Sequence, residues 1–228
     1  MKRNFLWAVI TAFMMLPLFS NAQQKPFKLG LQIAPGLGWL TPDESTGYES
    51  EGAGFGLSWS FVCDFALTEN YFLSTGVNYL SNNGKLRYID VKEVDNITAP
   101  VPVLRKYNLK YVEVPLSLKM KTNQFGAMKY FGQIGVGPAI NVSAKGKDNY
   151  GPVVEDLNIK EDINFFQIGL LFGGGTEFYI DKSTAITGSL LFRKGFTDVL
   201  GRVNTVYNPD IKEKATPFTF QFCIGVIF

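Results

Sequence analysis

Hydrophobic and polar residues alternate with a period of two along most of this chain, and the last eleven residues show the pattern most clearly. From Phe218 to Phe228 every second residue is a phenylalanine, isoleucine or valine, whereas Thr219 and Gln221 are among the residues between them. Successive side chains of a β-strand point to opposite faces of the sheet. The segment is therefore expected to form a strand with one strongly apolar face.

Seven earlier segments follow the same pattern, and turn residues separate them. Together with the final segment, the predicted strands span residues 27–40, 54–67, 71–82, 109–121, 128–142, 163–180, 184–196 and 218–228. Alternation also continues into residues 83–108, so the third strand is expected to run on into that connection. The pattern predicts an all-β chain with eight strands.

Alternation alone fits either a soluble β-sandwich or a membrane barrel, because both have one apolar and one polar face. Connection lengths favour the barrel. Long connections at 41–53, 83–108, 143–162 and 197–217 alternate with short turns at 68–70, 122–127 and 181–183. This places long loops at one end and short turns at the other, which is typical of outer-membrane barrels.

Aromatic residues on the apolar face gather at the two ends of the predicted strands. At the short-turn end they are Phe27, Phe65, Tyr71, Tyr130, Phe178 and Phe228. At the long-loop end they are Trp39, Phe55, Tyr79, Phe166, Phe192 and Phe218. Two aromatic belts around an aliphatic band match the interfaces of a bilayer.

These observations predict an eight-stranded antiparallel up-and-down transmembrane β-barrel in the bacterial outer membrane. Both termini are expected in the periplasm, with four long extracellular loops. Pro35, Pro115 and Pro138 fall inside predicted strands, where a missing N–H is expected to cause bulges or weakened pairing.

The N-terminus begins with the basic residues Lys2 and Arg3, continues with an apolar run over residues 5–19, and reaches small residues at 20–22. This is the pattern of a secretory signal peptide, and the run is shorter than a spanning helix requires. We predict a signal peptide over residues 1–22 and a barrel over residues 23–228. Two of the 22 basic residues lie in that leader and none of the 20 acidic ones, so the predicted mature chain has a net charge of zero.

Composition excludes several classes of function. A neutral chain without a basic footprint argues against nucleic-acid binding. The sequence has no histidine, which excludes Ser-His and Asp-His hydrolysis and removes the commonest metal ligand. Adjacent acids at 155–156 and 161–162 leave a histidine-free enzyme as an alternative, but loop carboxylates are usually solvated. We expect no catalytic, cofactor or metal site, and we expect Cys63 and Cys223 to be free thiols on different faces.

The predicted inner face carries isolated charges at positions where an eight-stranded barrel is just wide enough for side chains to fill. We expect an ion-pair network that closes the lumen, formed by Asp64, Glu113, Lys119, Lys129, Glu177 and Arg193. The alternative is a narrow channel or a barrel that binds a small ligand.

The run from Tyr111 to Lys119 contains a tyrosine, alternating aliphatic residues, Pro115 in mid-strand and a final lysine. It resembles the fourth strand of the PorT-like (porin-family) outer-membrane β-barrel proteins of Gram-negative bacteria. The resemblance implies a non-catalytic envelope protein surrounded by outer-membrane lipid and lipopolysaccharide. It also implies an envelope or protein-secretion partner.

A terminal phenylalanine on such a strand is similar to the signal that barrel-assembly machinery reads, and Phe228, with Phe220 and Phe222 before it, fits that role. A second reading is that Phe228 only completes the aromatic belt. In the long connections, residues 101–104 form an apolar run that is expected to be exposed and available to a partner.

Overall fold

The protein is described here from a computed structural model, which places residues 27–43, 47–94, 97–151, 153–201 and 214–228. The predicted signal peptide lies outside these residues. Within the described ranges no helix has the length and apolar character needed to cross a membrane. The same described residues contain one short 3-10 helix, η3 (Lys160–Asp162).

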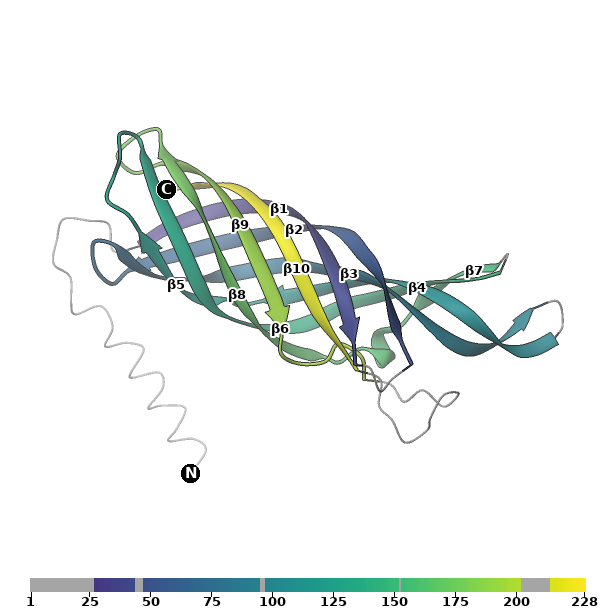
Figure 1. The fold of residues 1–228 in the computed structure, drawn as a ribbon. Coiled ribbons are helices and arrows are strands. Elements are labelled where there is room, and N and C mark those ends of the chain that lie inside the picture. Colours follow the sequence, from purple (N-terminus) through teal and green to yellow (C-terminus); the bar gives the residue numbers. More distant parts are fainter. Residues whose placement is uncertain (1–26, 44–46, 95–96, 152, 202–213) are drawn as a thin grey trace, which may run out of the picture.

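The strands are β1 (Phe27–Pro42), β2 (Glu49–Ala66), β3 (Tyr71–Val94), β4 (Ile97–Glu113), β5 (Leu116–Lys121), β6 (Met128–Tyr150), β7 (Val153–Asn158), β8 (Phe166–Tyr179), β9 (Ala185–Gly195) and β10 (Ala215–Ile227). They form one antiparallel sheet in the order β2-β1-β10-β9-β8-β6-β4-β3, and pairing of β2 with β3 closes it (Figure 1). β4 and β5 act as one strand, so the described residues form a ring of eight strands. The predicted barrel is confirmed.

Pairing is interrupted at Pro35 and Pro115 without a shift of register, whereas Pro138 pairs with Ile168 of β8 without interruption, so the expectation is wrong there. Pro115 separates β4 from β5, yet Glu113 pairs with Ala139 and Leu116 with Val136 in the same register. β1 likewise loses its pairing with β10 between Ile33 and Gly36 and then resumes it unchanged. Both interruptions agree with the missing N–H of proline.

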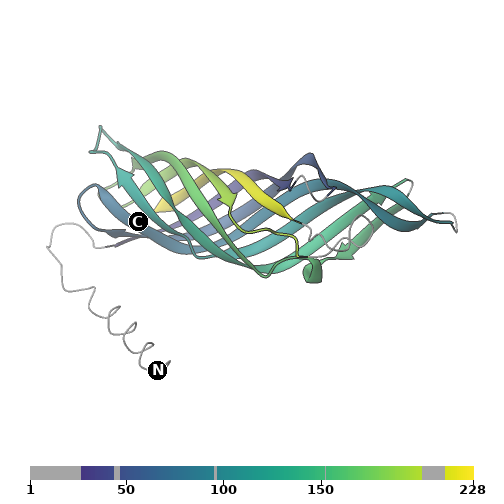
Figure 2. The ribbon, with the colours of Figure 1, turned by 60° about the horizontal axis from the view of Figure 1, so that its bottom comes forward.

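The main difference from the predicted elements lies in the strands at the long-loop end. β3 runs on to Val94, as the alternation over 83–108 predicts, and pairs continuously with β4, which begins at Ile97 and not at the expected residue 109. β6 runs on to Tyr150 and pairs with β7. These extensions form a sheet that projects beyond the other strands in both views (Figures 1 and 2). It is called the projecting sheet below.

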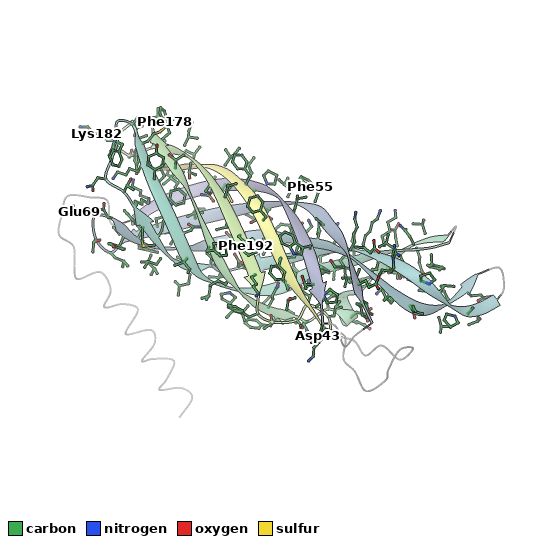
Figure 3. All side chains as sticks on the ribbon, in the orientation of Figure 1. Asp43, Phe55, Glu69, Phe178, Lys182 and Phe192 are labelled. Atoms are coloured by element: carbon green, nitrogen blue, oxygen red, sulfur yellow. The ribbon has the colours of Figure 1, made fainter. Side chains whose placement is uncertain are left out.

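The outward face of the ring is apolar, and its aromatic residues form the two belts that alternation predicts. Phe178 lies near the short turns, whereas Phe55 and Phe192 lie toward the other end (Figure 3). At the long-loop end the rings pack on one another, with Trp39 stacked on Phe218 at 5.7 Å and Trp59 stacked on Tyr79 at 5.8 Å between ring centroids.

β3 bends inward where it leaves the ring. Its residues 81–84 pack against the inner faces of β1 and β2, where Gly38 and Gly54 provide the space. A Cβ atom at Gly38 would lie 2.6 Å from the carbonyl oxygen of Asn83, and one at Gly54 would lie 2.7 Å from the Asn83 Cβ. Asn83 donates a hydrogen bond to the Phe55 carbonyl at 2.6 Å. The barrel wall itself therefore narrows the long-loop end.

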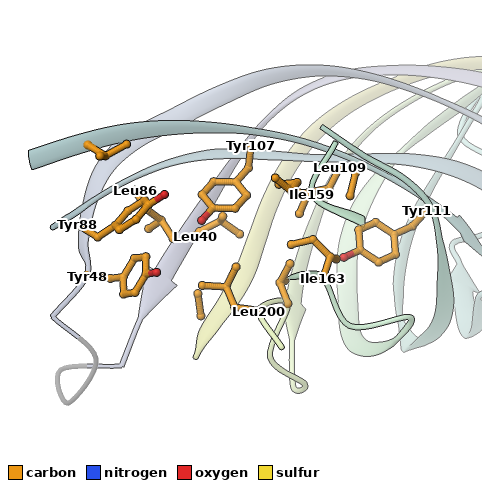
Figure 4. Packing of buried hydrophobic residues seen from close by; sticks show 14 of the residues in the cluster. Leu40, Tyr48, Leu86, Tyr88, Tyr107, Leu109, Tyr111, Ile159, Ile163 and Leu200 are labelled. Carbon is orange, nitrogen blue, oxygen red and sulfur yellow. The ribbon is translucent and has the colours of Figure 1, made fainter. Parts of the chain in front are cut away.

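An apolar cluster fills the space between the projecting sheet and the adjoining connections (Figure 4). Its largest buried members include Leu86, Tyr107, Leu109 and Tyr111. Val103 is also fully buried in this cluster. The expectation of an exposed apolar run over residues 101–104 is therefore wrong, because β4 alternates there and turns Val103 inward.

Candidate functional site: a filled lumen and a projecting sheet

The lumen near the short-turn end contains four buried charges that contact one another. The Lys119 ammonium lies 2.9 Å from Asp64 and 3.0 Å from Glu177. The Lys121 ammonium lies 3.3 Å from Asp64 and 2.8 Å from Glu177. All four side chains are at most 2% exposed, so the two carboxylates are balanced by two ammonium groups in a site that excludes solvent.

This cluster crosses the bore. Asp64 lies on β2 and Glu177 on β8, and four strand steps separate β2 from β8 in either direction around the ring. The two carboxylates therefore belong to opposite walls. Lys119 and Lys121 on β5 lie between them and join the walls through ion pairs.

A second polar layer lies closer to the long-loop end. Arg193 Nε lies 3.3 Å from Glu113, which also accepts a hydrogen bond from Asn78 at 2.6 Å. Arg193 also donates to Gln221, and Gln221 donates to Ser58 at 2.8 Å. These contacts connect β9, β4, β3, β10 and β2 across the lumen.

The same layer contains a chain of amides and a hydroxyl. Thr219 donates to Asn82 at 2.8 Å, and Asn82 donates to Gln167 at 3.2 Å. Thr219 is on β10, Asn82 on β3 and Gln167 on β8, so this chain also spans the bore. Buried polar groups are stable in such a site when they are hydrogen-bonded to one another.

In the described part of the chain, two small cavities lie between the layers. Cavities of about 40 and 20 Å³ lie beside Arg193, the first of them reaching Lys119. One water requires about 10–15 Å³ by a comparable measure. These cavities have room for a few waters and not for a metabolite.

The structure brings together five of the six expected lumen residues. Asp64, Lys119 and Glu177 share one cluster, and Glu113 contacts Arg193. Lys129 differs: it is half-buried and lies 5.7 Å from the centre of the Tyr179 ring. Its place in the cluster is taken by Lys121. Lys121 follows Lys119 by two residues and therefore shares its face, so strand periodicity contained the signal that could have identified it.

The projecting sheet has its own buried ion pair. Arg105 donates to both carboxylate oxygens of Asp148, at 2.5 and 2.6 Å. The guanidinium lies 5.3 Å from the centre of the Tyr88 ring. Burial alone would lower the pKa of Arg105, but the hydrogen bonds with Asp148 hold it above its ordinary value. Burial raises the pKa of Tyr88.

The carboxylate pairs considered for catalysis do not form a shared site. Glu155 lies 3.5 Å from Lys92, and Asp156 lies 3.8 Å from Lys147. Among the described residues no group of three or more acids and cysteines is arranged to hold a metal ion. Cys63 and Cys223 are free, as expected.

The three phenylalanines of the expected assembly signal lie on the outward face, between 43% and 47% exposed. Phe228 exchanges backbone hydrogen bonds with Leu29 of β1 at 2.8 and 2.9 Å. The C-terminal residue thus takes part in closing the ring between β10 and β1.

Several solved structures are similar to this chain at low sequence identity. The neisserial surface protein A is 13% identical, with a TM-score of 0.46 over 89% of this chain and 96% of that one. OprG from Pseudomonas aeruginosa is 10% identical, with a TM-score of 0.43 over 87% and 95%. Ail of Yersinia pestis is 11% identical, with a TM-score of 0.40 over 90% and 100%. No curated protein matches the sequence.

Residues 20–201 match the family described as "Outer membrane protein beta-barrel domain", which covers most of the chain. A closed ring with an apolar outward face and a polar interior is the structure that a membrane-spanning β-barrel requires. The chain therefore belongs to the outer membrane protein beta-barrel domain family and resides in the outer membrane.

Proposed function

We propose that this protein is a non-catalytic, non-conducting barrel that acts through its projecting sheet as a structural or partner-binding component of the cell envelope. The main support is the bridge from Asp64 through Lys119 and Lys121 to Glu177, which joins opposite walls of the lumen. A solute or hydrated ion could pass only if these buried ion pairs separated, which is costly because it leaves buried charges without their partners.

The proposed orientation places the short turns and both termini in the periplasm and the projecting sheet outside the cell. Phe228 lies at the short-turn end (Figure 1). Short periplasmic turns and longer extracellular segments are the usual arrangement in outer-membrane barrels. A cysteine introduced at Lys182 in the short turn 180–183 and one at Glu93 in β3 would test it, because only the outer position reacts with an impermeant thiol reagent in intact cells.

The surface proposed for a protein partner is the far part of the β3–β4 hairpin. Ile89 is 48% exposed and Val91 is 44% exposed, and they pair with the exposed residues Pro102 and Pro100. Apolar side chains gathered on a projecting element are typical of a binding surface. The PorT-like resemblance of residues 111–119 supports an envelope-assembly or secretion partner in particular.

Conductance in planar bilayers tests the closed lumen. The purified full-length barrel is expected to give no steady, ion-selective channels. A variant carrying Asp64→Ala, Lys119→Ala, Lys121→Ala and Glu177→Ala removes the bridge and is expected to conduct more than the native protein. Steady channels from the native barrel would contradict the proposal and support the alternative of a narrow channel.

Capture of a partner tests the surface role. Extraction in mild detergent followed by mass spectrometry is expected to recover one envelope protein reproducibly. Ile89→Asp with Val91→Asp is expected to abolish that recovery. Phe125→Asp is a matched control, because Phe125 is an apolar side chain exposed to 64% in the turn at the opposite end. Equal recovery with both variants would exclude the hairpin as the binding surface.

A separate proposal concerns assembly: Phe228, supported by Phe220 and Phe222, is the segment that barrel-assembly machinery recognises. Its support is the position of these outward-facing rings on the last strand, where Phe228 pairs with the first strand. The corresponding experiment is given in the Discussion.

A further inference from the structure

The outward face of the projecting sheet continues the apolar wall of the barrel but has a different composition. Tyr79, Val112 and Ile140 lie in one cross-strand row of that wall. Beyond this row the same face carries the basic residues Lys85 and Arg87 on β3, Lys106 and Lys110 on β4, and Lys145 and Lys147 on β6. These six residues are called the basic face below.

Three of these lysines are directly opposite one another. Lys85 pairs with Lys106, and Lys106 pairs with Lys147. Directly opposite residues in an antiparallel sheet have Cβ atoms about 5 Å apart, and like charges in such positions repel. The row therefore lowers the stability of the sheet unless an anion lies over it.

The acidic residues near this face neutralise only its margins. Glu51 lies 2.8 Å from Arg87, and Asp156 lies 3.8 Å from Lys147. Lys85, Lys106 and Lys145 have no ion pair among the described residues, and Lys106 and Lys145 are exposed. The centre of the basic face is thus a group of ammonium ions available to an external anion.

The position of the basic face matches the region just outside the hydrocarbon core. Lys110 is two residues beyond Val112, and Lys106 is six residues beyond it. At about 3.3 Å per residue and a strand tilt of about 40°, these lysines lie roughly 5 and 15 Å above the end of the apolar wall. The interfacial layer adds about 5–7 Å to each side of the core. Lys110 therefore lies at the level of that layer, whereas Lys106 lies beyond it, on the outer side where the phosphates and sugars of lipopolysaccharide are located.

We propose that the basic face binds the anionic groups of outer-leaflet lipopolysaccharide, namely the phosphates and acidic sugars nearest the lipid. The apolar wall below would hold acyl chains of the same molecule, so one ligand would contact both surfaces. Phosphate and carboxylate oxygens accept strong hydrogen bonds from ammonium groups, and one anion can lie between two lysines of the row. The inference uses the orientation proposed above but is independent of any protein partner.

The test measures binding of purified lipopolysaccharide to the full-length barrel in detergent, where orientation in a membrane plays no part. Binding is expected to weaken as salt is raised, because exposed charges are screened. Dephosphorylated lipopolysaccharide is expected to bind roughly tenfold more weakly, since charge-assisted hydrogen bonds are lost. If lipopolysaccharide did not bind in this way, the proposals on the closed lumen and on the hairpin surface would not be affected.

Substitutions in the basic face test whether its lysines are responsible for the binding of lipopolysaccharide. Lys85→Gln, Lys106→Gln and Lys147→Gln together are expected to weaken binding by about tenfold or more, because three ammonium groups are removed. Lys106→Glu alone is expected to weaken it as well, and Lys106→Arg is expected to retain it. Lys182→Glu, at an exposed residue of the short turn, is the matched control and is expected to change nothing.

Three results would overturn the proposal. The first is equal binding by the native protein and the triple variant, each shown to be folded by its heat-dependent mobility on gels. The second is an equal affinity for intact and dephosphorylated lipopolysaccharide. The third is displacement of lipopolysaccharide by equimolar inorganic phosphate, which would indicate a site for the free ion.

Discussion

Lys119 and Asp64 form an ion pair of 2.9 Å inside the barrel, although 55 residues separate them and β3 lies between their strands. Asp64 on β2 and Lys119 on β5 can meet across the intervening strand β3 because the wall is curved and both side chains point into the lumen. Together with Glu177 on the opposite wall, this pair connects the two sides of the lumen. The first prediction concerns this contact.

Lys119→Met is expected to reduce the free energy of unfolding by about 3–5 kcal/mol, because it leaves a buried carboxylate without a balancing charge. Adding Asp64→Asn to the same chain is expected to recover part of that loss, since the uncompensated charge is removed as well. Urea unfolding in detergent measures both effects. Lys182→Met, in an exposed turn, is the control, and an equal loss in that variant would show that the buried pair has no special role.

In the projecting sheet, Asp148→Asn is expected to remove the bidentate partner of the buried Arg105 guanidinium and to leave it the longer contact with Asp162, at 3.8 Å. The cost is expected to be about 3–5 kcal/mol, and it should be local because these residues lie beyond the ring. Limited proteolysis and hydrogen exchange of β4 and β6 measure the loss. Asp156→Asn breaks an exposed pair with Lys147 and is expected to cost about 0–1 kcal/mol. Equal protection in the two variants would contradict this prediction.

Gly76→Ala is expected to destabilise the ring by more than 1–3 kcal/mol, roughly the cost of a strained backbone conformation alone. Gly76 has a φ of 148°, and an added Cβ would lie 1.9 Å from the Phe61 carbonyl oxygen on β2. Gly188→Ala is the matched control, because a Cβ there meets nothing within 4 Å. The prediction fails if both variants refold into detergent with the same midpoint in urea.

The stability of the short turn between β8 and β9 is expected to depend on the protonation of Asp181. Its carboxylate accepts hydrogen bonds from the backbone N–H groups of Ser183 and Thr184, both at 2.7 Å, and these lower its pKa to about 2. Because the pKa in the folded state lies below the ordinary value, the stabilisation is present at neutral pH and is lost as pH falls toward 2. Carboxyl carbon NMR should show Asp181 titrating near pH 2. A midpoint near 4 would contradict the turn geometry.

Phe228→Ala is expected to lower the amount of folded barrel in the outer membrane several-fold while leaving refolding of the purified protein in detergent nearly unchanged. This separation is expected because the proposed defect is in recognition during assembly. Phe27→Ala is the control, because Phe27 is 47% exposed and Phe228 is 46% exposed in the same aromatic belt. An equal loss with Phe27→Ala would support the reading in which Phe228 only completes the belt.

The outward wall could be predicted from the sequence because it depends on local periodicity alone. A lipid-facing strand must place an apolar residue at every second position, and the chain from Phe218 to Phe228 shows this without reference to any other segment. The eight strands, the alternating connections and the aromatic belts followed from the same rule. Periodicity also predicted that β3 continues beyond residue 82, but it did not predict the early start of β4 or the extension of β6, because hydrogen-bonded pairing with a neighbour determines where those strands begin and end.

Inside the barrel, the sequence determined which side chains point inward, and the tertiary structure decided which of them meet. Periodicity identified Asp64 and Glu177 as lumen residues, but only closure of the ring places them on opposite walls, with Lys119 and Lys121 between them. The same holds for the basic face, whose lysines are far apart in the chain and become neighbours through strand register. A two-residue period is a property of each strand, whereas register and curvature are properties of the whole sheet.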